Sequence, residues 1–469
     1  MFTKVARIVV AVVCATALLP GCVAHRPEPI APARSAAALE TRSLTDARLD
    51  AFLRSATANT AGTRVWNLET LTLAAVYFHP DLEVAYARLA VARAAIITAG
   101  QRPNPTLSLS ALYDSPPPLT IGFALDFLLE TFGRRGARTA QAQALADAAR
   151  QDVATAAWQV RGSVRAALLD LWAAQRRAEF GRSRLQLEAQ LVGLLERRLA
   201  LGEASALDVA RERINRDQFT IAVRDADSAA LTARARLATA IGVPARALDG
   251  VAIDLTAFDV PPNLDAHFGE GELRGRALTG RTDVQASLAQ YAAAQSALRL
   301  ALAGRYPNVA LAPGYTYDQG VHKIGLSGIS LELPIFNRNQ GPIAEAVARR
   351  TQAAANFTAL QAQIIGAIDT AAVAYRTAGQ AVATTTALLD AQQRRQARTA
   401  KLFAAGEIDR PTLLTGSLEV GAIQLSTIDS AIAQRQALGA IEDALQQPLF
   451  DPRSTSPTDL VRRTAPEAR

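Results

Sequence analysis

The fold of this chain is decided by a stretch that opens Gly304-Arg305-Tyr306-Pro307-Asn308 and closes Leu333-Pro334-Ile335-Phe336-Asn337-Arg338-Asn339-Gln340-Gly341, with two short alternating runs between. An earlier version opens Gln101-Arg102-Pro103-Asn104 and closes Phe132-Gly133-Arg134-Arg135-Gly136. Pro103 and Pro307 are 204 residues apart (307 − 103), and Gly202 and Gly406 are separated by the same distance (406 − 202). Landmarks that recur in one order at one spacing indicate internal duplication. Each copy reads as helix, strand hairpin, very long helix, tight turn and helix.

The alternating runs predict four strands, at about residues 105–127 and 308–334. In each run apolar side chains take every second position, and small or polar side chains take the positions between. The first copy places Leu107, Leu109, Phe123 and Leu125 on the apolar face. In the second copy the alternation slips, which predicts a bulge near Ser327-Gly328.

Strands of this length, apolar on one face and small or polar on the other, are typical of an outer-membrane β-barrel. The apolar residues just named would then face lipid. Four strands cannot close a barrel alone, and open edges are not tolerated in lipid, so the pattern favours an oligomer. The alternative is a soluble antiparallel sheet packed against the helices.

The helices between the hairpins are unusually long. Residues 119–243 contain no proline, and a helix over 137–199 would span about 90 Å. Its narrow apolar stripe, which includes Val160, Val164 and Leu168, is of the coiled-coil type. Gly202 suits a left-handed position after the helix, and a second helix returns over 206–241. The duplicate runs over 343–403, turns at Gly406 and returns over 411–447.

We expect the chain to divide as follows: residues 1–21 form a lipoprotein signal peptide, for which the residues are given below, 22–45 an acylated N-terminus and tether, 46–243 the first repeat, 244–272 a connector, 273–447 the second repeat, and 448–469 a disordered tail.

The N-terminus predicts export. Lys4 and Arg7 precede an apolar run that ends Leu19-Pro20-Gly21-Cys22, which resembles a bacterial lipobox in which Cys22 carries lipid. That resemblance, with Val23 after the cysteine, implies sorting to the outer membrane. The alternative is an ordinary secretory signal with an incidental cysteine. The other cysteine, Cys14, lies inside the signal, so no disulfide is expected.

Metal sites and enzyme chemistry find no support in the residue pattern. None of the four histidines, at positions 25, 79, 267 and 322, lies at ligand spacing from another. Nucleophile-elbow, phosphate-loop and zinc-protease motifs are missing, so we expect no enzyme and no cofactor beyond the lipid. The net charge of +7 comes from arginines interleaved with acids along the helices, which indicates solvated faces and not a nucleic-acid surface.

The duplicated plan resembles the outer-membrane efflux protein family, the TolC-like ducts, over about residues 60–447. The family fold implies a homotrimer in which each protomer gives four strands to one twelve-stranded β-barrel, and its helical hairpins form an α-barrel in the periplasm. Within the family, the runs Glu130-Thr131-Phe132-Gly133-Arg134-Arg135-Gly136-Ala137-Arg138 and Phe336-Asn337-Arg338-Asn339-Gln340-Gly341 are most similar to the CzcC-like cation-efflux branch.

The resemblance also gives the two helical turns a role. In the family such turns form the periplasmic gate and the surface that meets a periplasmic adaptor. Here they hold Leu201, Gly202, Glu203, Ser205 and Asp208 in the first copy, and Gly406, Glu407 and Asp409 in the second. Gate carboxylates follow the glycine in many members; Asp208 fits, whereas Thr412 occupies the equivalent position in the second copy, with Asp409 nearby. Without the family, both turns could be simple helical-hairpin loops.

The sequence thus predicts a lipid-anchored exit duct in the outer membrane, partnered by an adaptor and an inner-membrane pump of the resistance–nodulation–division type, with divalent heavy-metal cations as cargo. Two alternatives stay open. One is a drug-efflux or type I secretion duct of the same family, and the other is a periplasmic coiled-coil scaffold lipoprotein.

Overall fold

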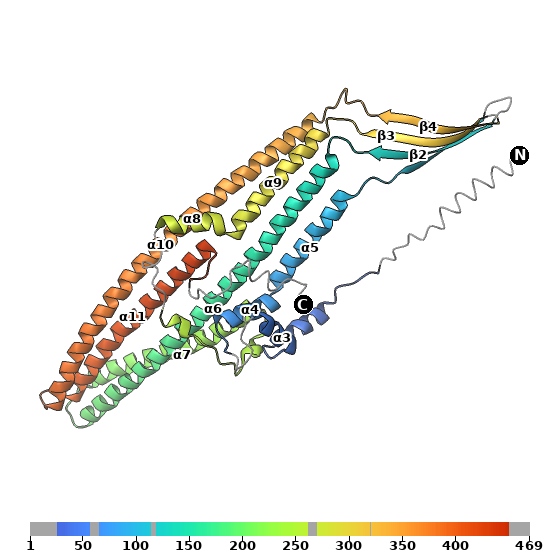
Figure 1. The fold of residues 1–469 in the computed structure, drawn as a ribbon. Helices are drawn as coiled ribbons and strands as arrows, with labels where there is room; N and C mark the ends of the chain where they lie inside the picture. Colours follow the sequence, from blue (N-terminus) through green and yellow to red (C-terminus); the bar gives the residue numbers. More distant parts are fainter. Residues whose placement is uncertain (1–25, 57–64, 114–118, 261–269, 319, 450–469) are drawn as a thin grey trace. The chain divides into compact units, whose positions relative to one another are not determined.

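The computed structural model describes residues 26–56, 65–113, 119–260, 270–318 and 320–449, in two compact units divided between Thr41 and Arg42 (Figure 1). In the first unit, helix α2 (Pro32–Glu40) is exposed along its whole length. The predicted lipidation site Cys22, the signal peptide and the predicted C-terminal tail from residue 450 lie outside the described residues.

The second unit runs through the same series of elements twice (Figure 1). The first series is α4 (Leu68–Phe78), α5 (Pro80–Gly100), β1 (Thr106–Tyr113), β2 (Leu119–Leu129), α6 (Arg134–Ala200) and α7 (Ala206–Ile241), and it is preceded by α3 (Ala47–Ala56). The connector then forms the short 3₁₀ turns η1 (Ala245–Leu248) and η2 (Thr256–Phe258). The second series is α8 (Glu270–Gly280), α9 (Thr282–Ala303), β3 (Val309–Asp318), β4 (Val321–Leu331), α10 (Gln340–Ala404) and α11 (Arg410–Leu445).

The two longest helices follow β2 and β4 through short loops that end in a left-handed residue. Helix α6 has 67 residues and α10 has 65, which corresponds to about 100 Å each. The residue before each helix is left-handed, Gly133 with φ +72° and Asn339 with φ +60°. Phe132 is also left-handed, with φ +54°, which is uncommon for a bulky residue. Both helices begin three residues before the predicted 137 and 343.

The four strands form one antiparallel sheet in the order β1-β2-β3-β4. The pairing of β2 with β3 joins the two copies, with Phe123 opposite Tyr315 and Leu129 opposite Val309. Between β3 and β4 the register shifts after Ala312, so that Ser327 has no opposite residue. This confirms the bulge predicted from the slip in alternation.

Two large apolar cores and a small cluster of Ala85, Leu89 and Val153 hold the helices together, and among the described residues no strand contributes to any of them. The larger core is centred on α4, α6 and α7, with Leu71, Val164, Leu168 and Leu237 all fully buried. The smaller core lies among α8 to α11 and includes Leu438 and other buried residues of α10 and α11. The sheet must therefore find its apolar partner outside the protomer.

Candidate functional site: the strand faces and the two helical tips

One face of the sheet is apolar and exposed. Leu107, Leu109, Phe123 and Leu125, predicted to face lipid, lie on this face as the opposite pairs Leu107–Leu125 and Leu109–Phe123, and they are 39–61% exposed. The register continues the face onto β3 and β4 through Tyr315 and Ile324, the latter 86% exposed. Exposed apolar area of this kind marks a contact with membrane or protein.

The opposite face is lined with small and polar side chains. Ser108 donates a hydrogen bond to Asp126, and Thr120 donates to Asp318 over 2.9 Å. Lys323 forms an ion pair with Asp318 at 2.9 Å. A Cβ on Gly314 would come within 2.6 Å of the Phe123 carbonyl oxygen on the neighbouring strand, so glycine is needed where β2 and β3 approach closely. This face suits water.

Arginines close the junction where strands meet helices. Arg134 donates to the carbonyl of Ala303 over 3.2 Å and to that of Tyr306, at the end of α9. Arg138 donates to the carbonyls that end α5 and pairs with Glu130 at 2.6 Å. Cations at helix C-termini satisfy carbonyls that lack partners within the helix. Arg138 thus pairs with a carboxylate as well as with carbonyls, whereas Arg134 donates to carbonyls.

The two predicted tips have the same backbone geometry. Gly202 and Gly406 have φ of +76° and +77°. In the first tip the Glu203 amide donates to the Arg198 carbonyl over 2.8 Å, and in the second the Glu407 amide donates to the Leu402 carbonyl over 2.9 Å. These are the bonds of a Schellman motif, in which glycine takes the left-handed position at least cost.

The side chains predicted to act at the tips are all exposed: Leu201, Glu203, Ser205, Asp208, Glu407 and Asp409. Ser205 caps α7 by accepting from the Leu207 amide over 3.1 Å. Asp409 caps α11 by accepting from the Thr412 amide over 3.1 Å. Asp409 is therefore the counterpart of Ser205, and Asp208, three residues inside α7, corresponds to Thr412.

Asp409 also links the two tips, because Arg198 at the end of α6 pairs with it at 2.8 Å. Hydrogen bonds from Thr412, with Arg198 beside them, hold the pKa of the Asp409 carboxyl below its usual range. The sequence could not indicate this contact, which joins residues 211 positions apart. Asp208 lies 3.8 Å from Arg211 and Glu203 lies 3.9 Å from Arg198, so among the described residues of the two tips Glu407 is the acid without an ion pair.

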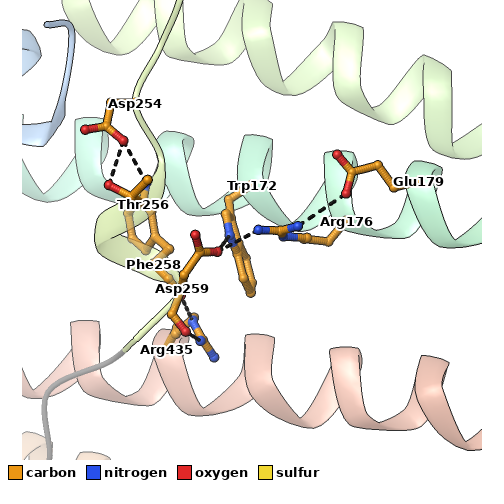
Figure 2. A network of polar contacts seen from close by, with 8 residues as sticks. All are labelled: Trp172, Arg176, Glu179, Asp254, Thr256, Phe258, Asp259 and Arg435. Carbon is orange, nitrogen blue, oxygen red and sulfur yellow. Dashed lines mark hydrogen bonds and ion pairs between the residues drawn. The ribbon is translucent and has the colours of Figure 1, made fainter.

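Further along the helices, the connector forms a clasp between the two copies, made of Trp172, Arg176, Phe258, Asp259 and Arg435 (Figure 2). The Asp259 carboxylate accepts from Trp172 Nε1 over 3.1 Å and from Arg176 over 2.7 Å, both on α6. On α11, Arg435 donates to the carbonyls of Phe258 and Asp259, and its guanidinium lies 4.6 Å from the centre of the Trp172 ring.

A second tie between the copies is a buried ionic cluster. Glu442 of α11 is fully buried and pairs with Arg161 and Arg165 of α6, each at 3.3 Å. Arg165 also pairs with Asp443 at 3.0 Å. Breaking such a buried pair on one side alone is strongly destabilising. Sequence reasoning missed both ties because their partners lie in different copies.

The described histidines have local roles. His79 caps α5 by accepting from the Asp81 amide at Nδ1 over 3.3 Å, and burial above all lowers its pKa. His322 lies against Tyr315 and Tyr317 on the apolar face. The part of the chain that the structure describes contains no group of three metal-ligating side chains; His25 and His267 lie outside it.

Comparison with known proteins agrees with this arrangement. Residues 75–243 match the family described as outer membrane efflux protein. The cobalt-zinc-cadmium resistance protein CzcC of Cupriavidus metallidurans is 24% identical over 282 residues, which are 60% of this chain and 65% of CzcC. The match thus spans slightly less than two thirds of that relative.

Solved structures share the fold. The outer-membrane channel OprN has a TM-score of 0.66 and 21% identity, with 82% of this chain and 91% of OprN covered. VceC of Vibrio cholerae has a TM-score of 0.67 and 19% identity, with 81% and 96% covered. CusC has a TM-score of 0.66 and 17% identity, with 83% and 95% covered.

The fold is thus that of an outer-membrane efflux channel, with long helical hairpins joined to a small sheet. The predicted resemblance to the outer-membrane efflux protein family, including its CzcC-like branch, is confirmed. The family and its solved members are passive channels and not enzymes.

Proposed function

We propose that three copies of this chain form an outer-membrane exit duct, which passively conducts cargo delivered by a periplasmic adaptor and an inner-membrane pump. The observation that carries the proposal is the sheet: one face is apolar and exposed, the other is small and polar, and β1 and β4 are its edges. A lipid-exposed sheet must close so that no edge is left open. Three sheets of four strands close into one barrel.

The helices support the same assembly. Helix α10 contains an 18-residue window with a mean hydropathy of 1.3, of which only 17% is buried in the protomer. By length and composition this window could cross a membrane. However, α10 has 65 residues, more than three times the roughly 20 that a membrane span requires. Contact with neighbouring copies in an α-barrel would cover this apolar surface. Family members are trimeric channels that work with adaptors and inner-membrane pumps.

For cargo we propose divalent heavy-metal cations, because the curated relative is a cobalt-zinc-cadmium resistance protein. Such a system would use a pump of the resistance–nodulation–division type, and selection among metals would belong to that pump. Structural likeness to drug-efflux channels keeps drugs as the second candidate cargo. A periplasmic scaffold lipoprotein is less favoured, because it would leave the apolar sheet face in water.

Lipidation and docking complete the proposal. Cys22 would carry the lipid that helps to anchor the chain in the outer membrane, and the two tips would meet the adaptor through the exposed residues around Gly202 and Gly406. Labelled palmitate should enter the wild type and not Cys22→Ser. Label retained in the variant would exclude this anchor.

The duct itself is tested by extracting the protein from outer membranes and comparing unheated with heated samples in electrophoresis. We expect a trimer that dissociates on heating and conducts ions in a planar bilayer. A strain that lacks the gene should become sensitive to zinc, cobalt or cadmium, and the cloned gene should restore resistance. A water-soluble monomer without conductance would contradict the proposal, and restored drug resistance without metal resistance would change the cargo.

A further inference from the structure

Four arginines lie at one end of the sheet: Arg102, Arg135, Arg305 and Arg338, called here the junction arginines. They stand 4 residues before β1 (106 − 102), 6 after β2 (135 − 129), 4 before β3 (309 − 305) and 7 after β4 (338 − 331). Because the strands are antiparallel neighbours, these four strand ends lie together at one end of the sheet. It is the end at which the chain passes from the strands into the long helices.

All four are exposed, and none forms an ion pair within the part of the chain that the structure describes. Arg134 and Arg138, by contrast, are held by helix-end carbonyls and by Glu130. Across residues 100–105, 130–138, 304–308 and 332–341 there are six arginines and two glutamates, a net charge of +4 (6 − 2). The fold thus uses two arginines to build the junction and leaves four charges at its surface.

Exposed apolar side chains lie among these charges. Phe132 stacks on Tyr306 with ring centres 3.9 Å apart, and both rings are about half exposed or more. The loop after β4 adds Phe336, 95% exposed, with Leu333 and Ile335. Asn339 donates to the carbonyl of Ala301 over 2.6 Å, which holds this loop against the end of α9. Aromatic and arginine side chains together are typical of the boundary between hydrocarbon and headgroups.

We propose that the end of the sheet that carries the junction arginines is a binding surface for anionic phospholipid in the leaflet that faces the periplasm. The apolar strand face continues directly into the junction, so lipid that covers Phe123 and Leu125 reaches its headgroups at the level of the arginines. A guanidinium binds a phosphate in a bidentate manner, and unpaired arginines favour anionic over zwitterionic headgroups. This inference rests on the proposed function, since it requires the sheet to lie in a bilayer.

The test uses the full-length trimer in bilayers of phosphatidylcholine, with spin-labelled phosphatidylglycerol or phosphatidylcholine as the probe. Electron spin resonance separates lipid held at the protein from free lipid. We expect the wild type to hold phosphatidylglycerol several-fold more strongly, and we expect 1 M salt to weaken this preference. The variant Arg102→Gln/Arg135→Gln/Arg305→Gln/Arg338→Gln should lose this preference. One cation beside an anionic headgroup contributes about fivefold, which matches a several-fold preference if each bound lipid meets about one of the four arginines. The four Arg→Lys changes should keep most of the preference.

A matched control removes four other exposed arginines, at positions 197, 394, 398 and 410 near the helical tips, that are likewise without an ion pair among the described residues. Changing these to Gln should leave the lipid preference intact. Equal loss in both variants, or no preference in the wild type, would overturn the proposal. If the junction variant fails to form trimers in lipid-free detergent while the Lys variant forms them, the arginines bind neighbouring protomers and the proposal is wrong. A trimer that conducts normally without lipid preference would refute this inference and leave the duct standing.

Discussion

Replacing Arg435 with Met should open the clasp, so that the connector residues Phe258 and Asp259 are released from α11 (Figure 2). Arg435 is 5% exposed and donates three hydrogen bonds to carbonyls, including those of Asp259 and Ala431 at 2.8 Å each. Bonds from a charged donor contribute about 1.5–3 kcal/mol each, and stacking on Trp172 adds about 1 kcal/mol. Burial lowers the pKa of Arg435 and so opposes its charge. The sum of the separate bonds is therefore an upper bound, and we take the net loss as the upper part of the cost of leaving a buried carbonyl without its donor, about 2–3 kcal/mol.

That loss raises the open population about 30- to 150-fold, because 1.4 kcal/mol corresponds to a factor of ten. Opening exposes Phe258, which is 1% exposed in the closed clasp, so thermolysin cleavage before Phe258 should accelerate by a similar factor. Arg349→Met is the matched control, because Arg349 lies exposed on α10 and, among the residues that the structure describes, pairs with Glu345 alone. Cleavage that rises less than threefold in Arg435→Met, or equally in the control, would refute the clasp.

Three other predictions concern the strands, the tips and one histidine. Leu109→Arg should reduce assembled trimer in the membrane fraction, since arginine in lipid costs up to about 2–4 kcal/mol, whereas Ser110→Arg on the polar face should assemble; equal yields would exclude this orientation. Gly202→Val and Gly406→Val each strain a left-handed backbone position, but among the described residues nothing packs against the added side chain. The yield of trimer should therefore stay near normal, while cross-linking to the adaptor and resistance fall. Full resistance in both variants would show that the tips do not dock. Burial lowers the pKa of His79, so its contribution to stability is complete above about pH 6.5 and declines as the pH falls toward the pKa of the folded state. Hydrogen exchange at the start of α5, corrected for intrinsic rates, should therefore quicken from pH 7.5 to 5.5 in the wild type and not in His79→Gln.

Local features of the fold could be predicted from the sequence because local residues determine them. Alternation fixed the strand faces, the slip near Ser327 located the bulge, and Gly202 and Gly406 marked the helix ends. The break between α4 and α5 is equally local, because Pro80 is the first residue of α5 and His79 lies between the two helices.

Contacts between the copies could not be predicted in this way. The pairing of β2 with β3, the clasp around Asp259 and the bond of Arg198 to Asp409 join residues far apart in the chain. Asp409 illustrates the difficulty: its position near the tip suggested a gate acid, but its side chain caps α11 and pairs across to α6. The spacing of residues in the sequence predicts that Asp409 lies near the tip, but it does not predict that Arg198 is its partner.

The pairing of β2 with β3 also sets an order of events. Thr120 and Asp318, which bond across this pair, are 198 residues apart in the chain, and the α6–α7 hairpin lies between them. If the chain is exported as proposed above, a chain that has emerged with only its first copy presents an unpaired strand edge beside an exposed apolar face, the combination that favours aggregation. Pairings of such long sequence separation form slowly. In the exported duct proposed above, β2 therefore cannot pair with β3 until the chain has crossed the inner membrane as far as Asp318, about two thirds of its 469 residues. Until then the first hairpin depends on whatever shields it in the periplasm.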